Sequence, residues 1–134
     1  MDDIRALADQ VREVAYAIHV FHGNGHLERI YENALLHRLR KRGLRVDQQV
    51  SVDVFDEDGT VLGICTVDLI IERTLLIELK AANRIAPEHI SQVIGYLKAC
   101  RIEHGLLINF GGSKFEIRKF AFSRDRKLLT KCAP

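Results

Sequence analysis

The stretch Asp68-Leu-Ile-Ile-Glu-Arg-Thr-Leu-Leu-Ile-Glu78-Leu-Lys80 joins two apolar runs that also carry charged side chains. Residues 61–71 and 75–79 are rich in β-branched and aliphatic side chains, which is typical of β-strands. Only three residues separate the two runs, so we predict a β-hairpin whose turn is centred at Arg73. In this register Asp68 lies directly opposite Glu78.

The predicted register gathers polar side chains on one face of the hairpin. Residues two apart on a strand point the same way, so Thr66 and Lys80 join Asp68 and Glu78 on that face. Two directly opposed carboxylates destabilise a strand pair. A divalent cation held by oxygen ligands, with Lys80 beside it, would offset their charge. The opposite face is apolar and must be buried; it consists of Val67, Leu69, Ile71, Leu75, Ile77 and Leu79.

Two other arrangements of this segment are open from the sequence. A two-residue turn would set Asp68 against Leu79 and would move the acid to the opposite face of the hairpin. In the second alternative, Asp68 marks the end of a strand, and Glu78 and Lys80 form an edge-strand pair that is exposed to water.

The rest of the chain predicts an α/β fold, more narrowly an α+β arrangement around a mixed sheet. Apolar residues recur at the helical period over 3–22 and 27–42, with Phe21 and Ile30 on the stripes that face the core. A helix between strands implies a crossover and a parallel strand pair, so we expect helices on both faces of the sheet. The predicted order is helix 3–22, helix 27–42 closed by Gly43, strands 49–55, 61–71 and 75–79, a helix opened by Pro87, strand 104–110, and a last strand with a bulge after Ile117.

Length and composition predict one domain, residues 1–134, in which the basic residues after about Ser123 fray. Three widely spaced cysteines without a C-x-x-C pair favour neither a disulfide framework nor a thiolate zinc site. We therefore expect the protein to be located in a reducing cytoplasm. The N-terminus has no basic leader and no apolar run approaches a membrane span of ~18 residues. Neither export nor membrane insertion is expected.

Basic residues are unevenly distributed although the net charge is only +2. From Lys114 to the C-terminus the sequence contains seven Lys or Arg residues and two acidic residues. A second basic cluster, between Arg38 and Arg45, lies near the end of the second predicted helix. Both clusters suit a phosphate backbone. The alternative for each is a solvated face, with cations that favour the C-terminal end of a helix.

With an acid, a Glu-Leu-Lys triplet and a following helix in this order, the chain resembles the PD-(D/E)xK nuclease superfamily, and within it the family named for its GxxExxY motif. That motif is present as Gly25-His-Leu-Glu28-Arg-Ile-Tyr31. The resemblance covers roughly residues 14–112 and continues through Asp68, Glu78-Leu79-Lys80, Gln92 with Tyr96, and Gly105-Leu-Leu-Ile-Asn-Phe-Gly111. Two positions depart from the family pattern: Val67 stands where the superfamily name has proline, and Asn24 stands where relatives have the proline of Gly-Pro-Gly.

The resemblance implies a restriction-endonuclease-like core and metal-dependent hydrolysis of nucleic-acid phosphodiesters. Asp68, Glu78 and the Leu79 carbonyl would hold Mg²⁺ or Mn²⁺, and Lys80 would orient water or offset transition-state charge. Glu28 would bind a second ion or a metal-bound water; its alternative role is an acid stabilised by the helix dipole. Gln92 would position phosphate or a metal ligand. Tyr31 and Tyr96 would support the acids or the backbone, unless each only packs in the core with its hydroxyl satisfied.

Nucleic acid is the partner that these features predict, with DNA favoured over RNA; assembly into a homo-oligomer is left open. The competing hypothesis is a catalytically inactive module that keeps the fold for nucleic-acid binding or oligomerisation, and the basic tail motivates it. A third hypothesis is hydrolysis of another phosphate ester, because the same metal site would serve that reaction.

Overall fold

The computed structural model describes residues 3–123 and 128–132. Its elements follow the predicted order and add one strand at the end. They are α1 (Ile4–His22), α2 (Glu28–Lys41), β1 (Val46–Phe55), β2 (Val61–Ile71), β3 (Leu75–Lys80), α3 (Pro87–Cys100), β4 (His104–Asn109), β5 (Glu116–Phe122) and β6 (Leu128–Cys132).

The helix ends follow local chemistry. The Asp3 side chain accepts a hydrogen bond from the Arg5 backbone N–H at 2.9 Å and so caps α1. Gly43 follows α2 with a φ of 84°, the left-handed conformation predicted for it. Pro87 begins α3, where its missing N–H leaves no bond unmade.

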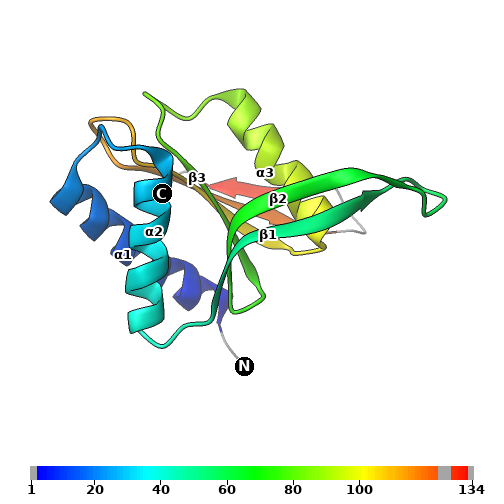
Figure 1. Ribbon diagram of the computed structural model, residues 1–134, viewed down its shortest axis with the longest axis horizontal. Coiled ribbons are helices and arrows are strands. Elements are labelled where there is room, and N and C mark those ends of the chain that lie inside the picture. The colour runs from blue at the N-terminus through cyan, green and yellow to red at the C-terminus, as the bar shows by residue number, and fades with distance from the viewer. Residues whose placement is uncertain (1–2, 124–127, 133–134) are drawn as a thin grey trace.

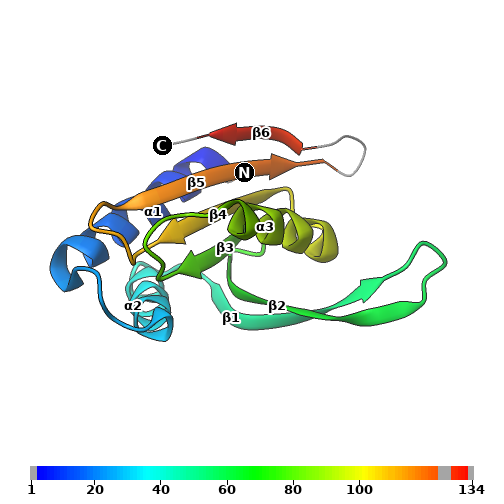
Figure 2. The same cartoon turned by 90° about the horizontal axis from the view of Figure 1, so that it is seen from above.

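The six strands form one mixed sheet in the order β1-β2-β3-β4-β5-β6, which Figure 2 lets the reader follow across the molecule. Only β3 and β4 are parallel, because α3 carries the chain from one to the other. The sheet passes between the α1–α2 pair and α3 (Figure 1). One core cluster packs α1 and α2 against Leu69, Ile77 and Ile108, and a second packs α3 against Leu76 and Leu107. The predicted mixed sheet with helices on both faces is therefore confirmed.

The β2–β3 hairpin has the predicted register. Leu69 pairs with Ile77, and Ile71 pairs with Leu75 across a three-residue turn. The regular ladder ends at Leu69–Ile77, where β2 turns away from β3. Thr66, predicted to lie opposite Lys80, is instead exposed and its hydroxyl lies 3.0 Å from that of Ser51 in β1.

The β1–β2 hairpin changes faces halfway along its length. Gln49 has a left-handed φ of 51°, and it interrupts the ladder between the pairs Gln48–Leu69 and Val50–Val67. Beyond this point Val67 packs with the α3 cluster, whereas Leu69 packs with α1 and α2. The prediction that Val67 shares a face with Leu69 is wrong, because the alternation of β2 breaks at Asp68, whose side chain bonds the Leu79 N–H of β3. The outer half of the hairpin extends away from the body of the molecule (Figures 1 and 2).

The bulge predicted after Ile117 is also wrong at that position. The β4–β5 ladder runs without a shift from His104–Ala121 to Asn109–Glu116. Ile117 belongs to the α1–α2 core cluster and Phe120 to the α3 cluster, so a sheet covered on both faces explains the broken alternation. An irregularity does occur later, between Ala121 and Phe122, against β6.

Two residues of the predicted helical stripes lie on the surface. Phe21 is 77% exposed and Ile30 is 44% exposed, whereas Glu32 is 2% exposed. The face of α2 that meets the sheet is centred on Tyr31 and Leu35 and extends to Glu32, so it is rotated from the predicted stripe. None of the helices in the described part of the chain is long and apolar enough to cross a membrane.

The basic segment after Ser123 contains a sixth strand. Residues 128–132 form β6 and pair antiparallel with β5, from Lys119–Cys132 to Phe122–Leu128. The remaining residues of the predicted tail after Ser123 lie outside the described ranges.

Candidate active site

Asp68 lies where β2 separates from β3. At this position the Asp68 side chain, and not its backbone carbonyl, accepts the hydrogen bond from β3. The carboxylate oxygen Oδ2 accepts a hydrogen bond from the Leu79 backbone N–H at 2.9 Å. In the other direction, the Asp68 N–H lies 3.4 Å from Oε1 of Glu78, a long bond. The two acids are 8% and 4% exposed, respectively. The hairpin therefore forces two carboxylates together in a buried position.

Lys80 places a positive charge beside this pair. Its Nζ lies 3.9 Å from Oε2 of Glu78, and its side chain is 18% exposed. Glu78 and Lys80 are two residues apart on β3 and so reach the same side of the strand.

The start of α2 adds two more carboxylates. Glu28 is half-buried, lies near Asp68 and Lys80, and is hydrogen-bonded by the backbone of Ala81. Glu32, one turn further along, is buried near Asp68 and lies 3.7 Å from the exposed Arg29 side chain. Four acids from one helix and two strands thus converge at the point where the sheet opens.

Gln49 connects the helical acids with those of the sheet. Its amide nitrogen donates to both carboxylate oxygens of Glu32, at 3.0 and 2.9 Å, and lies 3.3 Å from Oδ1 of Asp68. Gln48 adds a further hydrogen bond to Glu32 at 2.7 Å. The left-handed conformation of Gln49 thus coincides with an amide that bridges two buried carboxylates.

Burial and mutual repulsion raise the pKa values of three of these acids. Burial first, and then the nearby Asp68 charge, raise the pKa of Glu78 from 4.5 to about 8. Burial likewise raises the pKa of Asp68, although the Leu79 N–H opposes this effect. The pKa of Glu28 rises because of burial and the charge on Asp68. All three shifts describe a site with more negative charge than Lys80 offsets.

The described residues do not hold these acids as a finished metal site. Within 3–123 and 128–132, no group of three or more His, Cys, Asp or Glu side chains is arranged to hold a metal ion. The donor chemistry nevertheless fits a hard cation, because Mg²⁺ is commonly bound by one or two carboxylates and keeps several waters. Asp68 and Glu78 provide such a pair.

Gln92 and Tyr96 form a polar edge of α3, and Tyr96 lies near Glu78 and Asp68. Nε2 of Gln92 donates to the Tyr96 hydroxyl at 2.9 Å, and Oε1 of Gln92 is buried without a partner in the described part of the chain. Burial and the nearby Glu78 charge raise the pKa of Tyr96. His89 serves a different purpose: its Nδ1 accepts from the Ala86 N–H at 3.0 Å at the start of α3.

Tyr31 of the GxxExxY motif holds the loop between α1 and α2. Its hydroxyl donates to the Gly23 carbonyl at 2.6 Å and accepts from the His26 N–H at 3.1 Å. The ring is fully buried and stacks on Phe110, with centroids 4.7 Å apart. Gly25 has a φ of 110° in the same loop. This is the core-packing alternative for Tyr31, and it fixes the start of the helix that carries Glu28.

Asn109 fixes the segment that follows Lys80. Its buried side chain accepts from the Ala82 N–H at 3.0 Å and donates to the Ala82 carbonyl at 2.9 Å. Gly111 comes so close to this segment that a Cβ there would lie 2.3 Å from the Ala82 carbonyl oxygen. Together they hold the end of β3 in place next to the acids.

Sequence reasoning missed Glu32, Gln49 and Asn109 as parts of this site. Glu32 had a usable signal, since it lies one helical turn after Glu28 and next to Tyr31. Asn109 falls within the matched Gly105–Gly111 segment, but no role was predicted for it. Gln49 gave no signal, because its role depends on a backbone conformation that glutamine does not favour.

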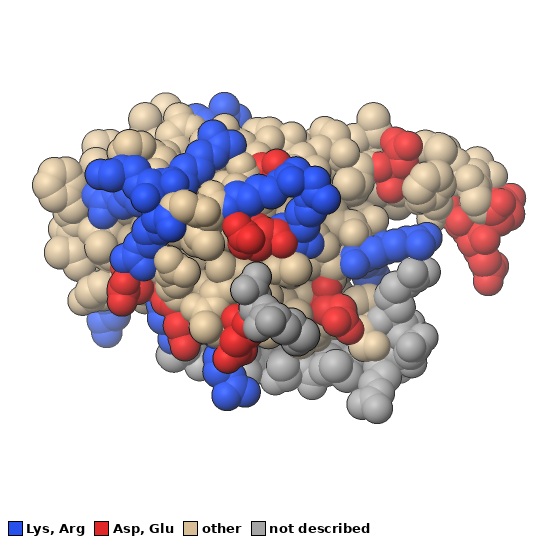
Figure 3. Space-filling model, turned by 90° about the horizontal axis from the view of Figure 1, so that it is seen from below, with Lys and Arg blue, Asp and Glu red and all other residues tan. Residues whose placement is uncertain are grey.

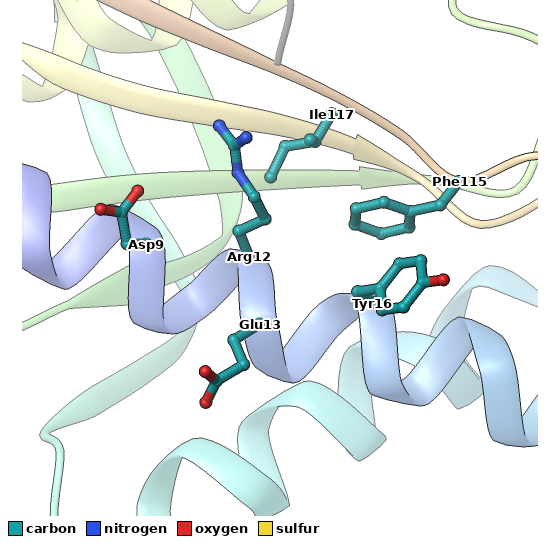
Figure 4. A pocket seen from close by; sticks show the side chains of 6 residues that line it. All are labelled: Asp9, Arg12, Glu13, Tyr16, Phe115 and Ile117. Atoms are coloured by element: carbon teal, nitrogen blue, oxygen red, sulfur yellow. The ribbon is translucent and has the colours of Figure 1, made fainter.

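A hollow of about 460 Å³ between α1 and the start of β5 lies apart from the acids. Figure 4 shows Arg12 and Tyr16 of α1 pointing toward Phe115 and Ile117 there. None of the acids described above lines it.

Comparison with known proteins agrees with the arrangement of the helices and strands. The family described as the PD-(D/E)XK nuclease superfamily matches residues 5–120. The crystal structure of SSO0001 aligns with a TM-score of 0.56 and 20% sequence identity, covering 68% of this chain and 48% of that one. The chain thus spans about half the length of that protein, and the likeness supports the fold. Curated proteins gave no match. Because the family match covers most of the sequence, the chain belongs to the PD-(D/E)XK nuclease superfamily.

Proposed function

We propose that the protein is a metal-dependent nuclease that hydrolyses phosphodiester bonds and that Asp68, Glu78 and Lys80 form its catalytic centre. The observation that carries this proposal is the buried Asp68–Glu78 pair with Lys80 3.9 Å from Glu78. Burial first, and then the neighbouring negative charge, raise the pKa of both acids, so their ionised forms would gain from a bound cation. Family membership makes a nucleic acid the substrate class.

The chain's own residues have separate roles in this proposal. Asp68 and Glu78 hold Mg²⁺ or Mn²⁺ through carboxylate oxygens, with the Leu79 carbonyl as an additional ligand. Such an ion supplies charge stabilisation at the phosphate and makes water a stronger nucleophile. Lys80 orients the attacking water and offsets negative charge that develops on the phosphate. Gln92 positions the phosphate from α3, and Glu28 binds a second ion or a water from α2.

We also propose that the protein belongs to the GxxExxY family within the superfamily. The Gly25, Glu28 and Tyr31 positions match the GxxExxY motif, and the structure gives that motif a physical purpose. Gly25 and Tyr31 fix the loop, so that Glu28 starts α2 next to Asp68. We assign the protein to the GxxExxY family on this basis and prefer DNA to RNA as its substrate.

Cleavage assays test the proposal directly. Purified protein is incubated with single-stranded, duplex and flapped DNA and with RNA, in Mg²⁺ or Mn²⁺, beside the Lys80→Ala and Glu78→Gln variants. We expect cleavage by the wild type and a loss of roughly 100-fold or more in each variant, the scale for removing one transition-state contact. Equal cleavage by wild type and variants, or none by any of them, would contradict the proposal.

A non-catalytic nucleic-acid-binding module is the second candidate function. It is favoured by one observation, that no three-ligand metal site is assembled among the described residues. Calorimetric titration with Mn²⁺ separates the two functions, with Asp68→Asn as the comparison. Salt-sensitive DNA binding without Mn²⁺ uptake or turnover would select this second function. Hydrolysis of another phosphate ester would instead give Mn²⁺ uptake with no cleavage of any nucleic acid.

A further inference from the structure

A groove of about 600 Å³ runs between the outer half of the β1–β2 hairpin and α3. In Figure 1, α3 lies alongside the hairpin on the side opposite to α1 and α2. Phe55 and Cys65 contribute to the hairpin wall, and Gln92, Gly95 and Tyr96 contribute to the helix wall. The groove exists because the hairpin leaves the sheet beyond Gln49.

None of the acids described above lines the groove, but Cys65 and Tyr96, which do, both lie near Glu78. Cys65 lies three residues from Asp68 on β2, which is about 10 Å along a strand. Gln92 and Tyr96, the polar edge of α3, line the groove and lie next to the acids. A chain-like substrate whose phosphate is at Asp68 and Glu78 would therefore continue into this groove.

Gly95 leaves the middle of the helix wall bare. It lies in the interior of α3 and is exposed, and no heavy atom outside its own helix backbone and neighbours lies within 4 Å of the position that a Cβ would take. A glycine at such a position costs roughly 1 kcal/mol relative to alanine. Nothing in the described part of the chain needs the space. A molecule from outside that lies flat on the helix would need it.

The groove combines flat apolar walls with charges at its rim. Tyr96 and Phe55 offer aromatic rings on opposite walls, and Lys98 and Arg101 bring positive charge to the helix side. Asp53 offers an acceptor on the hairpin side. A nucleotide has the matching parts, because its base stacks on aromatic rings, its phosphate attracts cations, and its amino groups donate hydrogen bonds.

The lining of the groove suits single strands better than duplexes. Unpaired bases are free to stack on Tyr96 and Phe55, whereas the bases of a duplex are already stacked and paired inside it. We propose that this groove binds an unpaired segment of nucleic acid next to the phosphate that is cut. The natural substrate is then a single strand or a duplex with a single-stranded end. This inference rests on the proposed function for the position of the cut.

Filling the groove at Gly95 tests the inference. Gly95→Trp places a large side chain in the open space, and Gly95→Ala is the matched control that adds only a methyl group. Fluorescence anisotropy without divalent ions compares a labelled single strand, a blunt duplex, and a duplex with a single-stranded end. We expect Gly95→Trp to weaken binding of the two probes with unpaired nucleotides by roughly tenfold, because one stacked base contributes about 1–3 kcal/mol. The affinity of Gly95→Trp for the blunt duplex should stay within about twofold of the wild type. The affinities of Gly95→Ala for all three probes should do the same.

A second pair of variants avoids any change in the helix. Phe55→Ala removes the aromatic ring from the hairpin wall, whereas Leu62→Ala shortens an exposed hairpin side chain that does not line the groove. We expect weaker single-strand binding only for Phe55→Ala. Thermal unfolding of all four variants checks that each one folds.

The outcomes separate this inference from the proposed nuclease activity. Unchanged single-strand affinity in both Gly95→Trp and Phe55→Ala, or an equal loss for the blunt duplex, overturns the groove assignment even if the protein cuts DNA. A wild type that binds no single strand also overturns it. Selective loss of single-strand binding supports the groove even if no cleavage is detected, and in that case only the nuclease proposal fails.

Discussion

Glu78 is an acid whose neutral form the fold favours. Its pKa in the folded protein is about 8 and its ordinary value is 4.5. The contribution of Glu78 to the stability of the metal-free protein is therefore fully present below pH 4.5 and is lost as the pH rises through 8. Each pKa unit corresponds to about 1.4 kcal/mol, which sets a ceiling of roughly 5 kcal/mol. We expect the free energy of unfolding of the metal-free protein to fall by a few kcal/mol over this range, as measured by urea denaturation in EDTA.

Glu78→Gln is the control for this pH dependence, because glutamine has nearly the same shape and does not ionise. The variant should be more stable than the wild type at pH 8 and should lose most of the decline with pH. Adding Mg²⁺ should stabilise only the wild type, since an ion that binds the native carboxylates shifts unfolding by mass action. A wild-type stability that rises from pH 5 to 8 without metal would contradict the assignment.

Substitution of Tyr31 is expected to change stability without changing metal binding. Tyr31→Phe removes the hydroxyl that bonds Gly23 and His26 but keeps the ring on Phe110. We expect the free energy of unfolding to fall by about 1–3 kcal/mol, since two part-buried hydrogen bonds are lost. The affinity for Mn²⁺ should stay within about twofold of the wild type, because the hydroxyl contacts none of the acids. A tenfold loss of Mn²⁺ affinity in a folded variant would make Tyr31 part of the metal site.

At the scale of elements, the bend in the β1–β2 hairpin depends on Gln49. Its amide bonds Glu32 and contacts Asp68, and its backbone is left-handed. Gln49→Ala should destabilise the protein by roughly 1–3 kcal/mol, because the buried Glu32 carboxylate loses donors. Gln49→Gly loses the same amide but accepts a positive φ, so it should be more stable than Gln49→Ala by about 1 kcal/mol. Urea titrations of both variants measure the difference, and an alanine variant as stable as the glycine variant would remove the backbone explanation.

Which elements could be predicted follows from how local their causes are. The β2–β3 register was predictable because the short connection between two apolar runs fixes it. The face of Val67 was not, since the alternation of β2 breaks at Asp68, whose side chain bonds the neighbouring strand β3. Likewise, β6 has an ordinary strand sequence whose pairing depends on the exposed edge of β5. At the site, Asp68 and Glu78 were predictable from register, whereas Gln49 and Glu32 required the packing of α2 on the sheet.

At the scale of the whole molecule, charge is divided between the two ends. Figure 3 shows Lys and Arg side chains gathered at the end that α1 and α2 form, and Asp and Glu side chains at the hairpin tip. Arg38 and Lys41 line a shallow hollow on α2, and the tip carries Asp56, Glu57 and Asp58. A polyanion is therefore attracted to the α1–α2 end of the molecule and disfavoured at the hairpin tip, which lies just beyond Phe55 at the outer end of the groove.

Two double variants test this division, one that reverses basic charges on α2 and one that removes acidic charges at the hairpin tip. Arg38→Glu combined with Lys41→Glu should weaken DNA binding by roughly tenfold and reduce its dependence on salt, equally for all sequences. Asp56→Asn combined with Glu57→Gln at the tip should leave binding unchanged or strengthen it. Anisotropy titrations at several salt concentrations measure both effects. Equal weakening by the two double variants would show that the charge division has no part in binding.

The hydrogen bond from the Leu79 N–H to Asp68 makes one backbone amide an indicator of the state of the Asp68 carboxylate. Deuterium uptake at that amide should be slow while the carboxylate faces the strand and should quicken when the side chain swings toward another ligand. The chemistry of the site and the continuity of the sheet thus share a single atom, Oδ2 of Asp68. A ligand that takes over this lone pair of Oδ2 would loosen the pairing of two central strands, whereas one that binds Oδ1 would leave it intact.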